Sequence, residues 1–373
     1  MKLNIKKRFI PFILLYLFTG VNGFAQKKHK LHRKGQWTAN FRLYTGYNDN
    51  ALKYSEKYLE RFMNNLDPER FEMITYDDVS IKGRLFVSYR KKWFSRHYSR
   101  ISFAFQRTQY TMNTFKSWNM FSIYLRQDFA RKASVQFTYQ YLPYFYVRTY
   151  RDEDLVSIYG YSPNTFRPFE FNKEHYGLSF RNTFYKKWRV RLNTGLHRYF
   201  HNSHFTEYDS EKYYTGLKLE YPVTSNLKLA LGYQFAFNNA KGIDQSGEVK
   251  DESDDPDAGF YENKIDIKAA FSPKHYHRKK QTLELLGSYI ARDFTSPKKY
   301  RDDPTHVGRK DNIYSITLQY SIKWTSAIKT AIIINHNFRR SINSGSDYYR
   351  DFLMDEKNYS QNLYGIQLNY KIF

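Results

Sequence analysis

The sequence contains no cysteine, and no apolar run in it is long enough to cross a membrane as a helix. The missing cysteine excludes disulfides, thiol nucleophiles, cysteine-ligated zinc and a lipoprotein-type lipid anchor. A helical span needs about 20 consecutive apolar residues, whereas the mean hydropathy of this chain is −0.75. Acidic residues are also scarce, with 36 Asp and Glu against 60 Lys and Arg, and the formal net charge is +24.

Aromatic residues, by contrast, are abundant and make up 19% of the 373 residues. Disordered chains are poor in aromatic residues, so this composition indicates a folded chain. A hydrophilic chain rich in aromatics fits a transmembrane β-barrel, because only every second residue of a strand must face lipid. Strong positive charge is also typical of nucleic-acid-binding proteins. The regular placement of the charges, described below, favours a water-filled interior or contact with anionic lipid, and no nucleic acid partner.

The first residues have the pattern of a secretory signal peptide. A basic stretch that ends at Arg8 precedes the apolar run 9–18, and Gly23 and Ala25 are small residues three before and one before a cut at Gln26. We therefore expect export, with residues 1–25 as signal peptide, 26–36 as a basic periplasmic tail and 37–373 as a barrel in the outer membrane.

From Trp37 onward the dominant pattern is alternation of apolar and polar residues, which is typical of strands with one polar face. The clearest example has Leu227, Leu229, Leu231 and Tyr233 at every second position. Fourteen such segments follow one another along the chain. Single-chain bacterial barrels have an even number of strands. The fold predicted is therefore all-β, a transmembrane antiparallel up-and-down β-barrel of about 14 strands.

The connections between these segments alternate in length, as expected when short turns face the periplasm and long loops face outward. The connection 109–117 is short for an outer loop, so pairing is least certain there. The six short connections lie near 91–100, 129–133, 185–189, 222–226, 273–280 and 323–327. The seven mostly longer ones lie near 48–76, 109–117, 151–174, 200–212, 239–261, 294–312 and 340–361.

Two short motifs resemble those of known barrels. Gly365, Leu368, Tyr370 and the terminal Phe373 lie on the last alternating segment. They resemble the C-terminal signal read by the barrel-insertion machinery, which implies that machinery as a partner. The segment 46–50, Gly-Tyr-Asn-Asp-Asn, resembles the start of β-barrel porins. The whole mature chain is similar to porin-like Gram-negative outer-membrane barrels. Fatty-acid-transporter-like barrels also suit fourteen strands, but they carry an N-terminal hatch, for which this chain leaves only about ten residues.

The polar faces of the alternating segments are predicted to line the lumen. They carry more basic than acidic residues, and buried charges without partners would be costly in a dry core. A barrel wider than eight strands leaves room for water. The residues expected to line the lumen are Arg42, Lys82, Arg84, Arg126, Arg148, Arg181, Arg191, Lys218, Glu220, Lys264, Asp266 and Glu284. An alternative is that Arg42, Arg84, Arg181 and Arg191 pair with Glu220, Asp266 and Glu284 and only brace the wall.

Other clusters were weighed for chemistry, and neither a cofactor nor a metal is predicted. The acidic loop 244–257 offers Asp251, Asp254, Asp255 and Asp257 as candidate Ca²⁺ ligands, but it lacks EF-hand spacing and is more typical of a solvated loop. His275 and His277 lie in a basic turn that disfavours a cation. The segment 52–66 has apolar residues at helical spacing, interrupted by Ser55. It suits a constriction in the lumen, a partner-binding helix or a packed loop.

The function favoured by these features is a passive channel for small polar or anionic solutes, embedded in outer-membrane lipid. The alternative is a non-conducting barrel that acts as a binding, assembly or secretion partner through its long loops. A membrane hydrolase is a third reading, because His197, His201, His204 and Ser203 lie near one rim. No catalytic motif supports it, and no enzyme is expected.

Overall fold

The structure is a computed structural model that describes residues 35–93, 97–130, 132–184, 187–253, 255–273, 279–343, 345 and 347–373. The chain divides into a unit Met1–Lys34 and a unit Gly35–Phe373, and the second is described here. The predicted signal peptide, and the predicted tail up to residue 34, lie outside the described residues. His275 and His277 also lie outside them.

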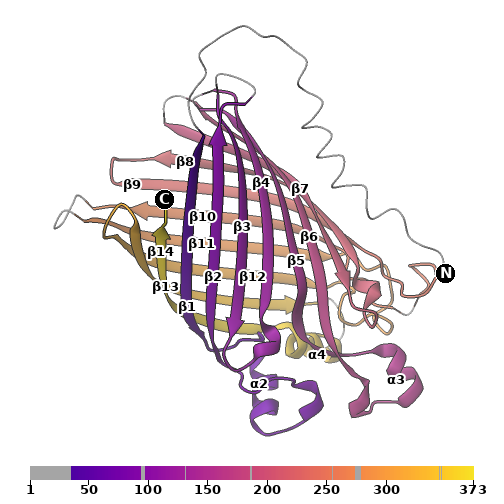
Figure 1. The fold of residues 1–373 in the computed structure, drawn as a ribbon. Helices are drawn as coiled ribbons and strands as arrows, with labels where there is room; N and C mark the ends of the chain where they lie inside the picture. Colours follow the sequence, from indigo (N-terminus) through magenta and orange to yellow (C-terminus); the bar gives the residue numbers. More distant parts are fainter. Residues whose placement is uncertain are drawn as a thin grey trace, which may run out of the picture. The chain divides into compact units, whose positions relative to one another are not determined.

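Fourteen strands pair in chain order, and the last pairs with the first, so the sheet closes into a barrel (Figure 1). All neighbouring strands are antiparallel. The strands are β1 (Gln36–Asn48), β2 (Asp78–Lys91), β3 (Ser99–Tyr110), β4 (Trp118–Asp128), β5 (Ser134–Arg151), β6 (Phe166–Phe184), β7 (Trp188–His201), β8 (Ser210–Pro222), β9 (Leu227–Ala240), β10 (Phe260–Phe271), β11 (Lys280–Phe294), β12 (Lys310–Lys323), β13 (Ile328–Ile342) and β14 (Tyr359–Lys371). The predicted fold is confirmed.

The connections after the even-numbered strands β2 to β12 are mostly shorter than those after the odd-numbered strands, as predicted. The exception is the β3–β4 connection, 111–117, which is no longer than the β2–β3 turn, 92–98, and shorter than the β10–β11 turn, 272–279. At the uncertain connection, β3 and β4 pair without interruption from Ser99 opposite Gln127 to Thr108 opposite Trp118. The ends of the barrel are called the turn end and the loop end below.

The short helices all lie in the long loops. Figure 1 shows α2, α3 and α4 gathered at the loop end. They are α2 (Glu56–Met63), η2 (Pro68–Arg70), η3 (Thr114–Lys116), α3 (Glu153–Tyr159), η4 (Pro163–Thr165), η5 (Thr206–Tyr208) and α4 (Asp347–Lys357). Among the described residues, no helix combines the length and the apolar character needed to cross a membrane.

The strand register separates an apolar face from a polar face, because successive side chains of a strand point to opposite sides. One row of residues paired across β8 to β13 is Leu217, Tyr233, Ile265, Tyr289, Tyr314 and Phe338. The next row along is Lys218, Gly232, Asp266, Ser288, Ser315 and Asn337. The two rows lie on opposite faces of the barrel wall.

The apolar face is exposed and continuous. Leu285, Leu318 and Ile334 pair with one another across three strands and are 50%, 42% and 44% exposed. Soluble monomers rarely expose contiguous apolar patches larger than a few hundred Å², and each such side chain gains about 1.5–3 kcal/mol when it leaves water. The outer face of the barrel is therefore built to contact lipid.

The seam between β1 and β14 depends on two glycines. Gly46 pairs with Gly365, and a Cβ at either position would collide with the ring of Tyr44. Because glycine has no side chain, the Tyr44 ring can lie over the seam at both positions. Aromatic rings often cover strand glycines in this way.

The other residues of the segment 46–50 hold the first long loop against the last strand. The Asp49 carboxylate accepts hydrogen bonds from the backbone N–H and the side-chain amide of Asn362, both at 2.7 Å. The Asn50 side chain donates to the Tyr54 and Ser360 carbonyl oxygens at 2.7 and 2.9 Å. The motif is thus explained by closure of the barrel at the loop end.

Candidate functional site

The polar face carries eleven of the twelve residues expected to line the lumen, on strands β1, β2, β4, β6, β7, β8, β10 and β11. In each case the register places the residue on the face opposite the apolar side chains. These residues are Arg42, Lys82, Arg84, Arg126, Arg181, Arg191, Lys218, Glu220, Lys264, Asp266 and Glu284.

The acids on this face pair with cations other than those of the bracing alternative. Asp266 pairs with Lys264 at 3.1 Å, and Glu284 pairs with Lys268 at 2.8 Å. Glu220 pairs with Arg189 at 2.8 Å. The arginines proposed as their partners have other neighbours. Arg42 donates to the Asn369 side chain at 2.8 Å, and Arg84 donates to the Tyr124 hydroxyl at 3.1 Å. The wall therefore keeps an excess of positive charge.

Cavities lie on the polar face near the turn end, with volumes of about 410, 380 and 310 Å³. Their borders include residues of the short turns, such as Lys187, Lys132 and Ser326. Basic side chains border all of them. Examples are Lys218 and Lys268 for the first, Arg126 and Arg181 for the second, and Arg42 and Arg84 for the third. Solvent therefore reaches the basic wall at this end of the barrel.

The loop end differs, because Arg148, the twelfth expected residue, is buried there with 4% exposure. Its guanidinium Nε donates to the Leu52 carbonyl at 2.9 Å, and Nη1 donates to the Glu356 carbonyl at 3.1 Å. A third bond goes to the Lys53 carbonyl. Arg148 does not contact the water of the lumen, contrary to the prediction. It joins β5 to the first and last long loops.

Glu356 of α4 is the second link between those two loops. Its carboxylate accepts a hydrogen bond of 2.5 Å from the Tyr58 hydroxyl of α2, and it forms an ion pair with Arg70 of η2. Burial alone would raise the pKa of Glu356, but Arg70 and Lys357 hold this pKa below its usual value. The carboxylate therefore stays ionised and keeps both partners.

An apolar core supports these polar links. Tyr54, Tyr58 and Phe71 pack edge to face, with ring centroids 5.3 to 6.4 Å apart. Leu59 and Phe62 of α2 pack against them. The predicted helix is confirmed within shorter bounds, and Ser55 caps it, since its side chain accepts the Tyr58 N–H. The buried members of this core are Leu52, Tyr54, Tyr58, Phe71, Met73 and Tyr146.

The β7–β8, β9–β10 and β11–β12 loops meet one another as well. The backbone N–H of Asp257, in the β9–β10 loop, donates to Asp303, in the β11–β12 loop, at 3.0 Å. His306 bonds Asp303 at 2.8 Å, and its ring lies 5.9 Å from that of Tyr208 on η5. We call the long loops that are held by these contacts and by the Arg148 and Glu356 links the outer cap.

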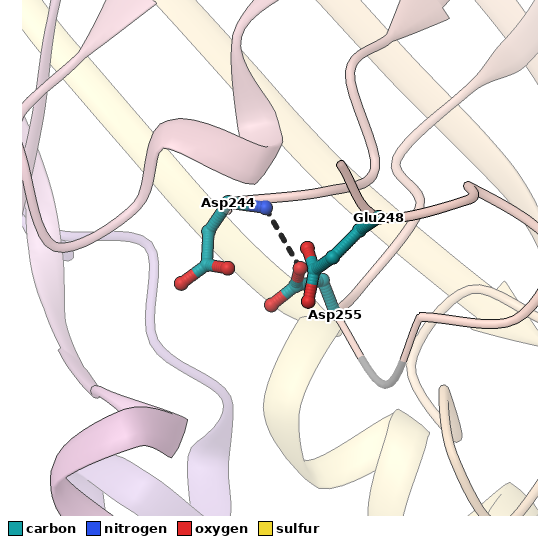
Figure 2. A group of neighbouring side chains, drawn as sticks. All are labelled: Asp244, Glu248 and Asp255. Atoms are coloured by element: carbon teal, nitrogen blue, oxygen red, sulfur yellow. Dashed lines mark hydrogen bonds between the residues drawn. The ribbon is translucent and has the colours of Figure 1, made fainter. Parts of the chain in front are cut away.

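A group of three carboxylates lies within the outer cap. Figure 2 shows Asp244, Glu248 and Asp255 turned toward one another, and one oxygen of each lies within 4.8 Å of the others. Only Asp255 was among the expected Ca²⁺ candidates. Asp257 is buried and pairs with Lys250 at 3.0 Å, Asp251 is exposed, and Asp254 lies outside the described residues. Burial and repulsion from Asp255 and Asp154 raise the pKa of Asp244.

The histidines near the loop end have partners other than Ser203. His204 bonds the Asp152 carboxylate at 2.6 Å, and the His201 ring lies 3.4 Å from the Asp209 carboxylate. The His197 ring stacks on His175 with centroids 4.4 Å apart. In the described part of the chain, no hydrogen bond joins Ser203 to a histidine.

The closed antiparallel sheet, the lipid-facing apolar side and the sorting of turns and loops together decide the class of protein. The chain has the architecture of a transmembrane β-barrel of the outer-membrane type. No family model matches its sequence, and no curated protein matches it. The identification therefore rests on the strand pairing and the two faces of the wall.

Solved structures similar to this barrel cover almost the whole chain at very low identity. The outer-membrane channel DcaP of Acinetobacter baumannii has a TM-score of 0.47 and 9% identity, over 94% of this chain and 100% of that one. A bacterial polysaccharide outer-membrane secretin has a TM-score of 0.46 and 7% identity, over 90% of this chain and 98% of that one. The anion-selective porin of Comamonas acidovorans has a TM-score of 0.40 and 9% identity, over 91% of this chain and 99% of that one.

The outer cap should loosen as pH rises, because of Glu207 in η5. Burial raises the pKa of this carboxyl to about 8. A carboxyl with a raised pKa in the folded state favours its neutral form, so stability falls between about pH 4.5 and pH 8. We expect hydrogen-exchange protection of residues 202–209 to decrease over this range.

The variant Glu207→Gln, which stays neutral, should remove most of that pH dependence. Glu211→Gln is the matched control, because Glu211 is exposed and pairs with Arg198 at 2.9 Å. Equal pH dependence in the wild type and in Glu207→Gln would contradict the assignment.

Proposed function

We propose that the barrel is a passive channel for small polar solutes, with a preference for anions. The observation that supports this most directly is the solvated, basic wall at the turn end, where cavities of about 310 to 410 Å³ are bordered by arginine and lysine. Charges of one sign in a confined space with low-dielectric walls raise the local concentration of the opposite ion. Rings of basic side chains are a general device for anion selectivity in pores.

The pairing of charges supports the same preference. Glu220, Asp266 and Glu284 are each held by a lysine or arginine of the wall. Arg42 and Arg84 bond only neutral partners in the described residues. The unpaired cations then carry the field that an entering solute meets.

Purified, refolded protein in a planar bilayer with a salt gradient should show a stable conductance that prefers anions. Arg84→Glu with Arg181→Glu should lower the anion-to-cation permeability ratio by about threefold or more, because the wall field is reversed locally. Matched controls are Arg107→Glu and Arg301→Glu, which change the same charge on the outer face and in an exposed loop. Equal ratios in both double variants would contradict a selective basic wall.

The outer cap favours a second candidate, a non-conducting barrel that binds a partner through its long loops. Arg148 and Glu356 join the first and last long loops at the loop end through buried contacts. A silent bilayer, formed with protein whose folding is confirmed by heat-modifiable migration, would favour this candidate over the channel.

A further inference from the structure

Two rows of basic residues face each other across β5 on the polar face of the barrel. We propose that Arg90, Arg100 and Arg126 in one row, and Arg181, Arg191 and Lys218 in the other, form a binding site for solutes that carry two or more carboxylate, phosphate or sulfate groups. This proposal deepens the proposed channel function by naming a solute class. We call these two sets the arginine rows.

The strand register places each row side by side. Arg90 on β2 lies opposite Arg100 on β3, which lies opposite Arg126 on β4. Residues directly opposite in antiparallel strands have Cα atoms about 4.5–5.5 Å apart. Like charges in this position destabilise a sheet, so three arginines in succession call for a negative partner.

The second row repeats the arrangement. Arg181 on β6 lies opposite Arg191 on β7, which lies opposite Lys218 on β8. Between the rows, β5 contributes only Gln136, opposite Arg126, and Ser134, opposite Arg181. β5 itself therefore adds no carboxylate between the rows, although Asp128 of β4 lies opposite Ser134.

Few carboxylates neutralise the rows. Arg126 pairs with Asp128 at 2.8 Å, and Lys218 lies 3.8 Å from Glu220, which also holds Arg189. Within the described ranges, no carboxylate lies within salt-bridge distance of Arg90, Arg100, Arg181 or Arg191. Four of the six cations therefore have no acidic partner.

Two of these arginines also have an unsatisfied donor. The Nε atoms of Arg90 and Arg191 are buried and have no hydrogen-bond partner. Arg90 is held in place by the Tyr98 ring, 3.6 Å from its guanidinium carbon. A buried donor without a partner costs free energy that a bound acceptor would recover, and a guanidinium fork suits carboxylate, phosphate and sulfate oxygens.

The cavity between the rows has a suitable size and position. It has a volume of about 380 Å³, and Arg126 and Arg181, one from each row, border it together with Arg189 and Lys132. Asp128 is the one carboxylate among its lining residues, and it is paired with Arg126. Neighbouring strands are about 4.7–4.9 Å apart, so adjacent guanidinium groups present repeated positive charge at that spacing. A solute with several anionic groups can meet more than one cation at once, whereas a monoanion cannot.

The test is calorimetric titration of citrate, a tricarboxylate, into the full-length protein in detergent micelles, with acetate as the monocarboxylate. We expect citrate to bind at least tenfold more tightly than acetate. The double variant Arg100→Gln/Arg191→Gln should weaken citrate binding by about tenfold or more, because it removes one charge-assisted contact from each row.

The matched control is Lys299→Gln/Lys310→Gln. These two lysines are exposed, lie at the loop end away from the rows, and carry the same total charge. Equal losses of citrate affinity in both double variants, or citrate binding no tighter than acetate, would overturn the site. Binding is measured without a bilayer, so the two proposals can fail separately. A protein that binds citrate but shows no conductance in a bilayer would refute the channel and support the site. A protein that conducts, but whose citrate affinity does not change in Arg100→Gln/Arg191→Gln, would refute the site and support the channel.

Discussion

Replacing Glu356 with alanine should increase the open probability of the proposed channel in single-channel recordings by about tenfold or more. The substitution leaves Arg70 without its ion-pair partner and Tyr58 without its acceptor, both in the buried part of the outer cap. Removal of one member of a buried pair typically costs about 3–5 kcal/mol, and each 1.4 kcal/mol changes an equilibrium about tenfold. The loops then separate more often, while the strands keep their pairing.

The adjacent carboxylate provides the control. Asp355 lies next to Glu356 on α4 and pairs with Lys57, but that pair is exposed, with side chains 29% and 57% accessible. Exposed pairs contribute about 0–1 kcal/mol, so Asp355→Ala should leave the open probability nearly unchanged. Proteolysis of the segment 347–357 should accelerate in Glu356→Ala alone. If both variants conduct like the wild type, the outer cap is not the barrier to solute flow.

The barrel was predictable because its information is local. Alternation along each strand reports which face contacts lipid, and the register of β8 to β13 repeats that alternation in adjacent rows. A shift of one residue would move every apolar side chain to the wet face, so the pattern itself selects the pairing. The same logic predicted the faces of Arg42 and Lys218.

The outer cap was not predictable in the same way, because its contacts join residues far apart in the chain. Arg148 fits the alternating pattern, yet it is buried by carbonyl groups of two loops. Glu356 is one acid among many in the long loops, and nothing near it in the sequence indicates Arg70 as its partner. Ser55 shows how a local signal can be misread: it interrupts the apolar stripe because it caps the helix.

The acidic loop gives a similar lesson. Closely spaced acids suggested Asp251 and Asp257 as neighbours of Asp255, but the loop brings Asp244 and Glu248 to Asp255 instead. Asp257 is held by Lys250. Loop backbones lack a repeating geometry, so spacing along the chain does not determine which carboxylates meet. The arginine rows were missed for a related reason: Arg90 and Arg100 become neighbours only through the register of β2 and β3.

Arginine substitutions at two consecutive residues can distinguish the lipid-facing side of the wall from the water-facing side. Leu318 lies on the apolar face of β12 between Leu285 and Ile334, and the next residue, Gln319, lies on the polar face opposite Glu284. An arginine on the lipid face of a barrel costs about 2–4 kcal/mol near the membrane centre. Leu318→Arg should therefore lower the free energy of unfolding by that amount in lipid vesicles.

Gln319→Arg places the same side chain at almost the same depth, but toward water and an acid, so its unfolding free energy should stay within about 0.5 kcal/mol of the wild type. Denaturant titration of the refolded barrel, followed by tryptophan fluorescence, measures both changes. The reverse order of stabilities would mean that the wall is turned inside out. Similar losses in both variants would mean that the interior at Gln319 is as dry as the lipid face. The wet basic wall on which the proposed anion preference depends would then not exist at that level of the barrel.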